Sequence, residues 1–508
     1  MNVGGWVDRS VDAGRGDAVA VIVDGGERLT WAELARQVDG VARALAVLGL
    51  GREQRVVLIL DDTPAFPAAF LGAMKLGAVP VPANFLLKAD DLVYIVDDSY
   101  AVAVIVDAAL LGPEPSVLGP RPAELRERLA ARPHVRVIVA NGPGAELDAW
   151  RSAPVPRVPA LEVHPEDMAF WLYSSGSTGR PKGVVHTHGN VAHTCRTYAE
   201  QVLETTALDR HYSTTKLFHA YGLGNGLTFP LWVGATAVYA PGRPTEARAL
   251  EVIARWRPTL LFSVPTLYAR MVASPDLGST DFSSVRRAVS AAEPLPPETW
   301  SRFRDATGVE ILDGIGSTEM LHIYCSNRAG EVRPGTSGRP VPGYRVEVRD
   351  EAGAPVGPGG SGELVVAGDS ALAFYWHQRA KTRAALRGDW FHTGDRYRVE
   401  PDGVFAYEGR VDDMLKVGGL WVSPIEIENR LMEHPAVAEA AVVGIDVDGL
   451  TRIKAFVIAR AVEPGLDDAL REWCKRGLQR NRFPHEVEFV SDFPRTATGK
   501  VQRFLLRR

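Results

Sequence analysis

Residues 173–183 read YSSGSTGRPKG and begin at the last residue of the apolar run MAFWLY (168–173), which predicts a buried strand. Glycines let this stretch curl so that backbone N–H groups face one concavity. Its hydroxyl groups and its lysine ammonium add donors and positive charge, which suits a triphosphate. The candidate phosphate-binding residues are Ser174, Ser175, Gly176, Ser177, Thr178, Gly179 and Lys182.

A flexible linker is the alternative interpretation, because Gly/Ser-rich stretches commonly join domains. The preceding strand and the compact RPKG that follows favour a binding loop. The Walker spacing, Gly-x4-Gly-Lys-Ser/Thr, does not occur in this stretch.

Composition limits the classes of function. A chain of 508 residues predicts two to four domains. Its net charge of −5 gives no general attraction to nucleic acid or to anionic membranes. Apolar runs such as AVAVIV are far shorter than the ~20 residues of a spanning helix. No signal segment is visible at the N-terminus. Three scattered cysteines argue against a disulfide framework and a zinc site, so we expect a cytoplasmic protein.

Strand-like and helix-like segments alternate along much of the chain. A capping box at Thr30–Glu33 starts a helical pattern that Gly49 ends, and the strand-like run RVVLIL follows. Such alternation predicts parallel sheets covered by helices. After about residue 335, short runs such as GELVVAG predict a small β-rich subdomain, and a last compact block begins near residue 412. The Pro-rich stretch at 113–122 predicts a surface loop.

The chain resembles the adenylate-forming superfamily, which includes the acyl-CoA ligases. The loop at 173–183 has the form of its phosphate loop. Three further motifs are most similar to the benzoate-type aryl-CoA ligases: KLFHAYGLGN (216–225), DGIGSTEMLHI (313–323) and GTSGRPVPGY (335–344).

The resemblance implies an α/β fold in two domains. The larger, residues 1–411, would hold two doubly wound, mostly parallel sheets and a small β-barrel-like subdomain at about 335–411. The smaller, residues 412–508, would be a mobile α+β domain.

The same resemblance implies ATP and Mg²⁺ as cofactors. Lys500, in PRTATGK, would bridge the acid's carboxylate and the α-phosphate. Glu319 and Thr178 would hold Mg²⁺, while Thr318 contacts the phosphates. Read alone, Ser-Thr-Glu could merely cap a helix. The remaining implied nucleotide contacts are Asp313, Gly314, Ile315, Asp395 and Arg410.

Substrate selection is implied by a second group of positions. His219 would act as a gate near the anhydride, and Ala220 replaces the Asp that pairs the ammonium in amino-acid-activating relatives. A flat pocket with one polar His edge suits a benzoate ring, although His322 could also be a core histidine. The other pocket positions are Tyr221, Gly222, Ala291, Ala292 and Ile323.

Two departures from the superfamily pattern stand out. Ile315 occupies the position of a tyrosine that usually stacks on adenine, as in the benzoate branch. Ala292 occupies the position of a glycine, and its methyl group would narrow the site.

Thioester formation requires a second arrangement of the same enzyme. The resemblance makes Asp412 the hinge about which the C-terminal domain rotates, and places Lys416, Gly418 and Gly419 along the tunnel for coenzyme A. A tight interdomain turn is the plainer interpretation of these glycines.

The function implied is an ATP-dependent aryl-carboxylate–CoA ligase acting on a small aromatic acid. An enzyme that loads a carrier protein's phosphopantetheine is the alternative, since the thiol arm is the same. A third possible function is that of a non-catalytic nucleotide-binding protein. The sequence does not indicate an oligomeric state.

Overall fold

The computed structural model describes residues 1–112, 122–174, 180–417, 420–447, 450–478, 483–495 and 501–507. Most of the Pro-rich stretch at 113–122 lies outside these ranges, as do residues 175–179 of the phosphate loop.

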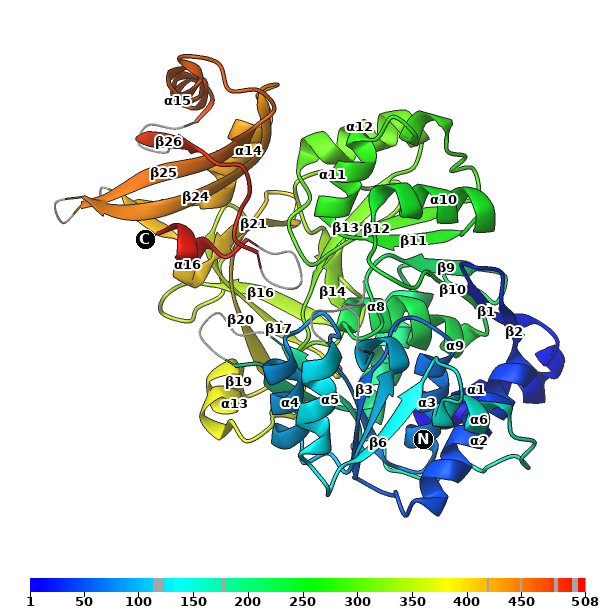
Figure 1. Ribbon diagram of the computed structural model, residues 1–508. Coiled ribbons are helices and arrows are strands. Elements are labelled where there is room, and N and C mark those ends of the chain that lie inside the picture. Colours follow the sequence, from blue (N-terminus) through cyan, green and yellow to red (C-terminus); the bar gives the residue numbers. More distant parts are fainter. Residues whose placement is uncertain are drawn as a thin grey trace.

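A long mixed sheet forms one half of the N-terminal region (Figure 1). Its strands, in spatial order, are β15 (Arg339–Pro340), β14 (Ile323–Ser326), β13 (Ile311–Gly316), β12 (Arg287–Ser290), β11 (Leu260–Ser263), β9 (Arg210–Ser213), β10 (Thr236–Tyr239), β1 (Val19–Val23) and β2 (Arg28–Thr30). The strands from β13 to β1 pair in parallel, and those at either edge pair antiparallel. Helices α10 (Glu246–Trp256), α11 (Pro265–Ala273) and α12 (Pro297–Thr307) cover one face with a separate apolar cluster.

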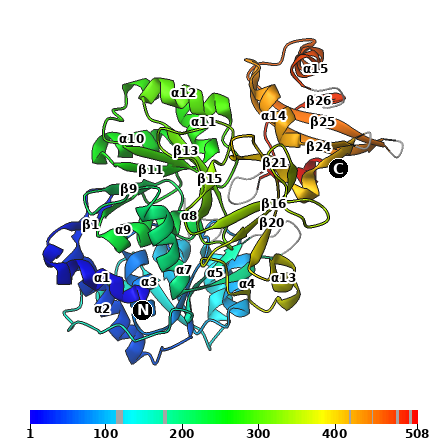
Figure 2. The ribbon, with the colours of Figure 1, turned by 180° about the vertical axis from the view of Figure 1, so that it is seen from behind.

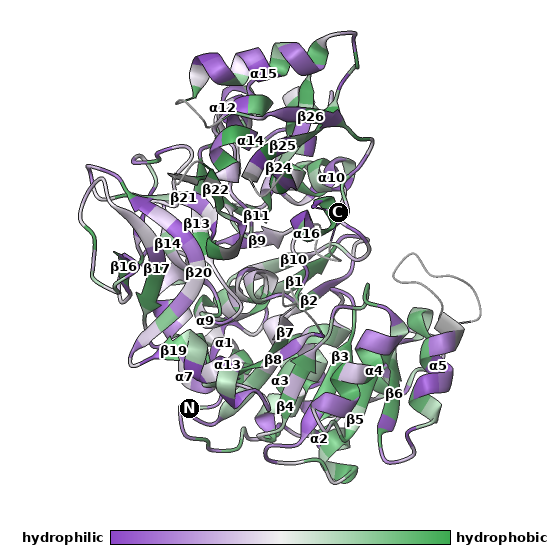
Figure 3. Ribbon diagram, turned by 90° about the vertical axis from the view of Figure 1, so that its left-hand side faces the viewer, coloured by the Kyte–Doolittle hydropathy of each residue, from purple (hydrophilic) through white to green (hydrophobic). Residues whose placement is uncertain are grey.

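A second sheet is entirely parallel along its described pairs, in the order β4 (Val79–Pro82), β3 (Arg55–Ile59), β5 (Ala103–Asp107) and β6 (Arg136–Ala140). Its helices are α2 (Trp31–Val47), α3 (Ala65–Lys75), α4 (Ala89–Asp98), α5 (Pro122–Ala130) and α6 (Glu146–Ser152). Strands β3 and β5 are hydrophobic along most of their length (Figure 3), as expected for strands buried on both faces.

Helix α2 begins as its sequence predicts. The Thr30 side chain accepts a hydrogen bond from the Glu33 backbone, and the Glu33 carboxylate accepts one from the Thr30 N–H in return. Gly49 follows the helix with φ +81°, a conformation that favours glycine.

The phosphate loop connects the two strands of a small antiparallel sheet. β7 (Met168–Ser174) pairs with β8 (Lys182–Thr187), and β8 pairs with β18 (Phe374–Tyr375). The apolar run before the loop is therefore a strand, as predicted.

An antiparallel curled sheet follows, made of β16 (Arg345–Arg349), β17 (Ser361–Ala367), β20 (Trp390–Val399), β19 (Leu386–Arg387) and β21 (Phe405–Arg410). Helix α13 (Arg379–Ala385) lies beside it.

The C-terminal elements group on one side of the molecule and join the rest beside β21 (Figures 1 and 2). They comprise the hairpin β22 (Leu415–Val417) and β23 (Leu420–Val422), the sheet β24 (Val437–Val447), β25 (Leu450–Ala459) and β26 (Glu486–Phe489), and the helices α14 (Pro424–Met432), α15 (Leu466–Gly477) and α16 (Arg503–Leu506). They enclose their own apolar cluster. The predicted fold class is confirmed: parallel sheets with helices, a curled β sheet and a C-terminal α+β unit.

Candidate active site

Both described ends of the phosphate loop present polar groups. Ser174 ends β7, and its buried hydroxyl has no hydrogen-bond partner among the described residues. Lys182 begins β8 on the opposite strand, where it pairs in register with Ser174. A buried hydroxyl beside a lysine suits an anion. Residues 175–179, which we expect to complete this cradle, lie outside the described ranges.

Glu319 lies directly beside Lys182. The Lys182 Nζ is 3.1 Å from the Glu319 Oε1, and the Tyr375 hydroxyl donates to the same oxygen at 2.9 Å. The ammonium also lies 4.0 Å from the centre of the Tyr375 ring. Burial alone would raise the pKa of Glu319, but Lys182 and these hydrogen bonds outweigh it and hold that pKa below its ordinary value. Glu319 is therefore ionised at neutral pH.

The turn that carries Glu319 is fixed from several sides. His186 Nε2 lies 2.7 Å from the Thr318 carbonyl oxygen, and the Leu372 N–H donates to the Glu319 carbonyl at 2.7 Å. Ser317 caps this turn by accepting from the Met320 N–H at 3.1 Å. The helix-cap interpretation of Ser-Thr-Glu is wrong, because a turn rather than a helix follows Ser317. His186 is buried, which lowers its pKa, so a neutral imidazole makes this contact.

Glu319 is the candidate metal ligand. Among the described residues, no group of three or more His, Cys, Asp or Glu side chains is arranged to hold a metal ion. A single ionised carboxylate still fits Mg²⁺, which takes its remaining ligands from phosphate oxygens and water.

Asp395 and Arg410 face each other across β20 and β21. They are register partners, and the Arg410 Nη1 lies 2.9 Å from the Asp395 Oδ1. Gly394 has φ +69°, and a Cβ there would lie 2.9 Å from the Arg410 Nη2. Asp395 thus lies in a strand, after a left-handed glycine that leaves room for the guanidinium.

The buried Tyr324 is affected electrostatically by both Asp395 and Glu319. Burial raises its pKa, and the nearby charges of Asp395 and Glu319 raise it further. Tyr324 lies in β14 beside β13, the strand that carries Asp313, Gly314 and Ile315. Both carboxylates therefore act on one buried side chain, although 76 positions separate them in the sequence.

Asp313 is the titratable group on β13. Burial raises its pKa to about 8. The next residue, Gly314, has its backbone close to β14, because a Cβ there would lie 2.8 Å from the Cys325 carbonyl oxygen. Ile315 is partly buried and packs on the main core.

The predicted gate and pocket residues follow β9. His219 precedes α8 (Ala220–Leu223), and the Tyr221 hydroxyl donates to the Val289 carbonyl at 3.2 Å. A Cβ on Gly222 would lie 2.1 Å from the Lys216 carbonyl oxygen, so only glycine fits there. Ala291 is buried, whereas Ala292 is exposed with φ +79°, an unusual conformation for alanine.

His322 and Ile323 form the other side of this group. Both are buried, and the His322 ring packs 5.6 Å from that of Tyr221, centre to centre. Burial lowers the pKa of His322 to about 3, so it is neutral.

Two buried aspartates hold the loop that carries His219. Lys216 donates to the Asp61 Oδ1 at 2.7 Å, and the Leu217 N–H donates to the Asp62 Oδ1 at 3.0 Å. Sequence reasoning missed both aspartates, and it also missed Tyr375 and His186, which contact Glu319 and the Thr318 carbonyl. The signal for the aspartates was their position directly after the strand RVVLIL, at the end of which polar residues of a parallel sheet often gather.

The hinge and tunnel positions are only partly described. Asp412 lies in a short 3₁₀ turn, Val411–Asp413, directly after β21, and Lys416 lies in β22. Gly418, Gly419 and Lys500 lie outside the described residues. The Arg507 Nη2 lies 2.7 Å from the Asp413 Oδ1, which joins the chain's end to this turn.

The three cysteines do not form a reactive centre. Cys195, Cys325 and Cys474 are free and buried. Burial raises the pKa of Cys474 to about 12 and raises those of the other two as well. No helix among the described residues is both long and apolar enough to cross a membrane.

Comparisons with known proteins show the family to which the chain belongs. The profile of the AMP-binding enzyme family matches residues 7–376, and that of the AMP-binding enzyme C-terminal domain matches residues 426–500. The benzoate–CoA ligase of Thauera aromatica is 45% identical over 511 residues, covering 99% of this chain and 94% of that protein.

Two solved structures are similar over the whole chain. A benzoate CoA ligase from Burkholderia xenovorans LB400 has a TM-score of 0.91 at 43% identity, covering 100% of both chains. The anthranilate CoA ligase AuaEII in complex with anthranoyl-AMP has a TM-score of 0.93 at 36% identity, covering 100% of this chain and 96% of the other.

Proposed function

The chain belongs to the AMP-binding enzyme family, and from this premise we propose that it joins a benzoate-type acid to coenzyme A, using ATP. It is an AMP-forming acid–thiol ligase. The observation that carries this function is the similarity to benzoate–CoA ligases, which extends over the full length of the chain.

In the first half-reaction, a carboxylate oxygen attacks the α-phosphorus of ATP, and pyrophosphate leaves. Two anions approach each other in this step, so positive charge must be supplied. Lys182 lies beside the described ends of the phosphate loop and serves the departing phosphates. Lys500, by resemblance, serves the carboxylate and the α-phosphate.

Glu319 and Thr178 are our proposed ligands for Mg²⁺. The ion supplies charge neutralisation on the phosphate oxygens when bound. In the structure Lys182 contacts the same Glu319 oxygen that the Tyr375 hydroxyl contacts, which leaves the carboxylate oriented and ionised.

Asp395 and Arg410 are our proposed ribose contacts. A carboxylate offers two acceptor oxygens to a vicinal diol. The ion pair to Arg410 fixes how that carboxylate points. Asp313, Gly314 and Ile315 would then contact the base.

In the second half-reaction, the thiolate of coenzyme A attacks the acyl carbonyl, and AMP leaves. Lys500 must give way to the thiol, so the C-terminal domain, residues 412–508, rotates about Asp412. Lys416, Gly418 and Gly419 would line the path of the pantetheine arm.

The acid is a small aromatic one. Ala220 and Gly222 flank Tyr221 with small residues, and no acidic side chain follows His219 to bind an α-ammonium group. Ala291, His322 and Ile323 complete the proposed pocket. A cytoplasmic location, where ATP and coenzyme A are both present, goes with this assignment.

An end-point assay tests the function. The protein is incubated with ATP, Mg²⁺, coenzyme A and, in turn, benzoate, hydroxybenzoates, furoate, cinnamate and short aliphatic acids. We expect aryl-CoA and AMP in equal amounts, with benzoates the best substrates. Replacing coenzyme A by a phosphopantetheinylated carrier protein is the second arm. Thioester on the carrier but not on free coenzyme A would contradict the ligase assignment.

A further inference from the structure

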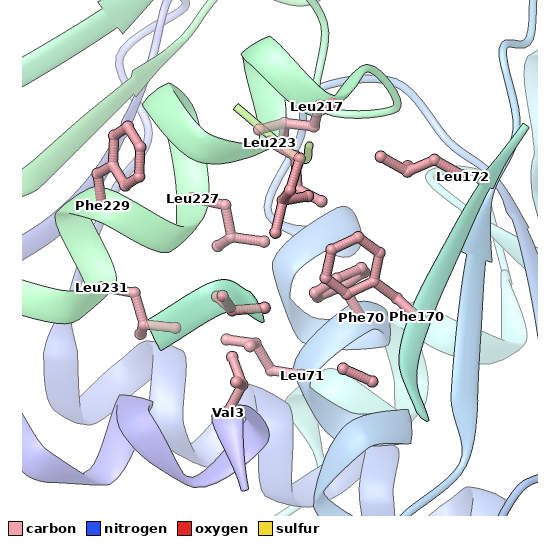
Figure 4. Close-up of a cluster of buried hydrophobic side chains, with 14 of the residues drawn as sticks. Val3, Phe70, Leu71, Phe170, Leu172, Leu217, Leu223, Leu227, Phe229 and Leu231 are labelled. Carbon is pink, nitrogen blue, oxygen red and sulfur yellow. The ribbon is translucent and has the colours of Figure 1, made fainter. Parts of the chain in front are cut away.

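The helix that begins with Ala220 does not continue regularly. α8 (Ala220–Leu223) passes into a π-helical segment, Gly224–Thr228, and then into α9 (Phe229–Val233). Leu223, Leu227 and Leu231 point from this stretch into the main core against α3 and β7 (Figure 4). Single π-helical turns inside helices frequently occur at functional sites.

Asn225, in the π-helical segment, contacts His322 on the neighbouring β14 side of the pocket. Its Oδ1 lies 3.1 Å from the His322 Nε2, and both side chains are buried. A Cβ on residue 224 would lie 2.4 Å from the His322 Cδ2, so the ring approaches this closely only because Gly224 has no side chain. The Phe229 ring packs edge-on against it at 4.6 Å between centres.

These contacts determine which nitrogen of His322 carries its hydrogen. An amide oxygen only accepts, so the Nε2 must donate. Burial lowers the pKa of His322 to about 3, although a hydrogen bond to the Tyr221 backbone opposes the shift, and the ring is therefore neutral. A neutral imidazole has one N–H, so Nδ1 carries a lone pair. This Nδ1 is buried and has no hydrogen-bond partner by distance and angle among the described residues.

We propose that Asn225 is a positioning residue for substrate selection, holding His322 in the tautomer whose Nδ1 accepts a hydrogen bond from a hydroxyl or amino group on the acid's ring. The inference rests on the proposed function, because it takes His322 as a wall of the aryl pocket. A buried acceptor without a partner disfavours ligands that leave it unpaired. Acids with a donor on the reachable ring edge are therefore favoured over matched acids without one.

The test compares 3- and 4-hydroxybenzoate with the corresponding fluorobenzoates. The readout is the hydroxy/fluoro ratio of kcat/KM for adenylation, measured by pyrophosphate exchange. In the wild type we expect this ratio to be above about 10 for one of the two ring positions. In Asn225→Leu we expect it to fall about tenfold, through KM for the hydroxy acid, with the fluoro acid changed less than about threefold.

A conservative variant distinguishes the effect of Asn225 on the His322 tautomer from an effect on folding. Asn225→Asp keeps an acceptor at the same place, so the ratio should survive at pH 8, where the phenol of the hydroxy acid is still protonated. The new carboxylate would stabilise the imidazolium and raise the pKa of His322. Protonation turns Nδ1 into a donor, so in this variant the ratio should fall as the pH is lowered, while the wild-type ratio stays level from pH 6 to 8.

Other titratable groups around the pair do not produce this pattern. Burial raises the pKa of Tyr198 and Tyr221 and lowers that of His211, whose ring contacts the Asn225 backbone, to about 4. All three are therefore neutral over this range. Asp313, which acts electrostatically on both tyrosines, titrates within it. Its effect on nucleotide binding is common to the two acids and cancels in their ratio.

Thr228→Val is the matched control, since it changes a buried polar side chain in the same π-helical segment. Its ratio should stay within about twofold of the wild type. Affinity for hydroxybenzoyl and fluorobenzoyl sulfamate analogues of the adenylate gives a readout that does not depend on turnover. If Asn225→Leu does not fold, the pH series of Asn225→Asp decides.

Failure of the proposed function and failure of this inference would give different results. A wild type that activates no benzoate would overturn the proposed function itself. A wild type that activates benzoates, but without a hydroxy/fluoro preference, would overturn the inference alone. So would an Asn225→Leu variant that loses activity toward both acids equally.

Discussion

At the scale of single residues, the arrangement around Glu319 is the most informative. One carboxylate oxygen receives both the Lys182 ammonium and the Tyr375 hydroxyl. A hydrogen bond to a charged group both strengthens and orients it. Tyr375 is therefore a positioning residue for the proposed metal ligand.

Replacing Tyr375 by Phe tests that role. The concentration of Mg²⁺ needed for half-maximal adenylation should rise about tenfold, because groups that orient metal ligands typically contribute that much to metal affinity. The KM for benzoate should not change. Pyrophosphate exchange at varied Mg²⁺ measures both quantities.

Tyr397→Phe is the control, because that buried hydroxyl is bound to the neutral Ser337 instead. An unchanged Mg²⁺ requirement in Tyr375→Phe would show that the hydrogen bond does not orient the metal ligand.

The buried Asp107 should make the stability of the fold depend on pH. It accepts from the Asp61 N–H at 2.8 Å, and burial raises its pKa to about 7. A group whose pKa is higher in the folded state binds protons more tightly there. Its stabilising contribution is full below about pH 4 and is lost as the pH rises through about 7.

Asp107→Asn should therefore flatten the fall in the free energy of unfolding between pH 4.5 and 8. Urea midpoints of the two proteins across this range measure it. Some slope should remain, because burial also raises the pKa of Asp62. Parallel curves for the variant and the wild type would contradict the assignment.

Residue-scale chemistry could be read from the sequence only where it lay within a motif. Glu319 and Asp395 were predicted as site residues in that way. Their partners could not be, because folding brings them from far away: Tyr375 is 56 positions from Glu319, and Asn225 is 97 from His322. Hydrogen bonds between residues so far apart produce no local pattern in the sequence.

At the scale of elements, periodicity was a reliable guide. The capping box predicted α2, and apolar runs predicted β3 and β7. The strand position of Asp395 was not predicted, because the sequence around it, His-Thr-Gly-Asp, is also typical of a turn. β20 accommodates Gly394 in the left-handed region, and this allows Arg410 to reach across.

Gly394→Ala tests that arrangement. The new Cβ would displace the Arg410 guanidinium, a flexible group, and so weaken its pairing with Asp395. We expect KM for ATP to rise about tenfold, while KM for benzoate stays within about twofold.

Gly388→Ala is a matched control on the approach to the same strand. Gly388 has φ +61°, so alanine there carries a similar strain, but no atom lies within 4 Å of the new Cβ. Equal effects of the two substitutions on KM for ATP would mean that strain alone, and not the displaced guanidinium, is responsible.

At the scale of the whole molecule, one lysine must serve one half-reaction and leave for the other. Lys500→Ala should slow adenylation by about 10²–10³ or more but leave thioester formation from supplied benzoyl-AMP intact. Asp412→Pro, at the turn after β21, should do the opposite, because it stiffens the proposed hinge. Separate assays of the two half-reactions measure this. Equal losses in both steps for either variant would contradict domain rotation.

Composition and motifs along the chain predicted the domains 1–411 and 412–508, and this division stays a prediction. The placement of the C-terminal elements beside β21 was not predicted, since it depends on contacts between segments that the sequence does not mark.

The central claim is that the acid is activated as an acyl-adenylate. Benzoate labelled with ¹⁸O in its carboxylate tests this most directly, with ATP and coenzyme A and mass analysis of the products. If a carboxylate oxygen attacks the α-phosphorus and the thiol then attacks the carbonyl, one ¹⁸O atom per turnover is found in AMP and none in pyrophosphate. Label in inorganic phosphate, with ADP formed instead of AMP, would contradict the account.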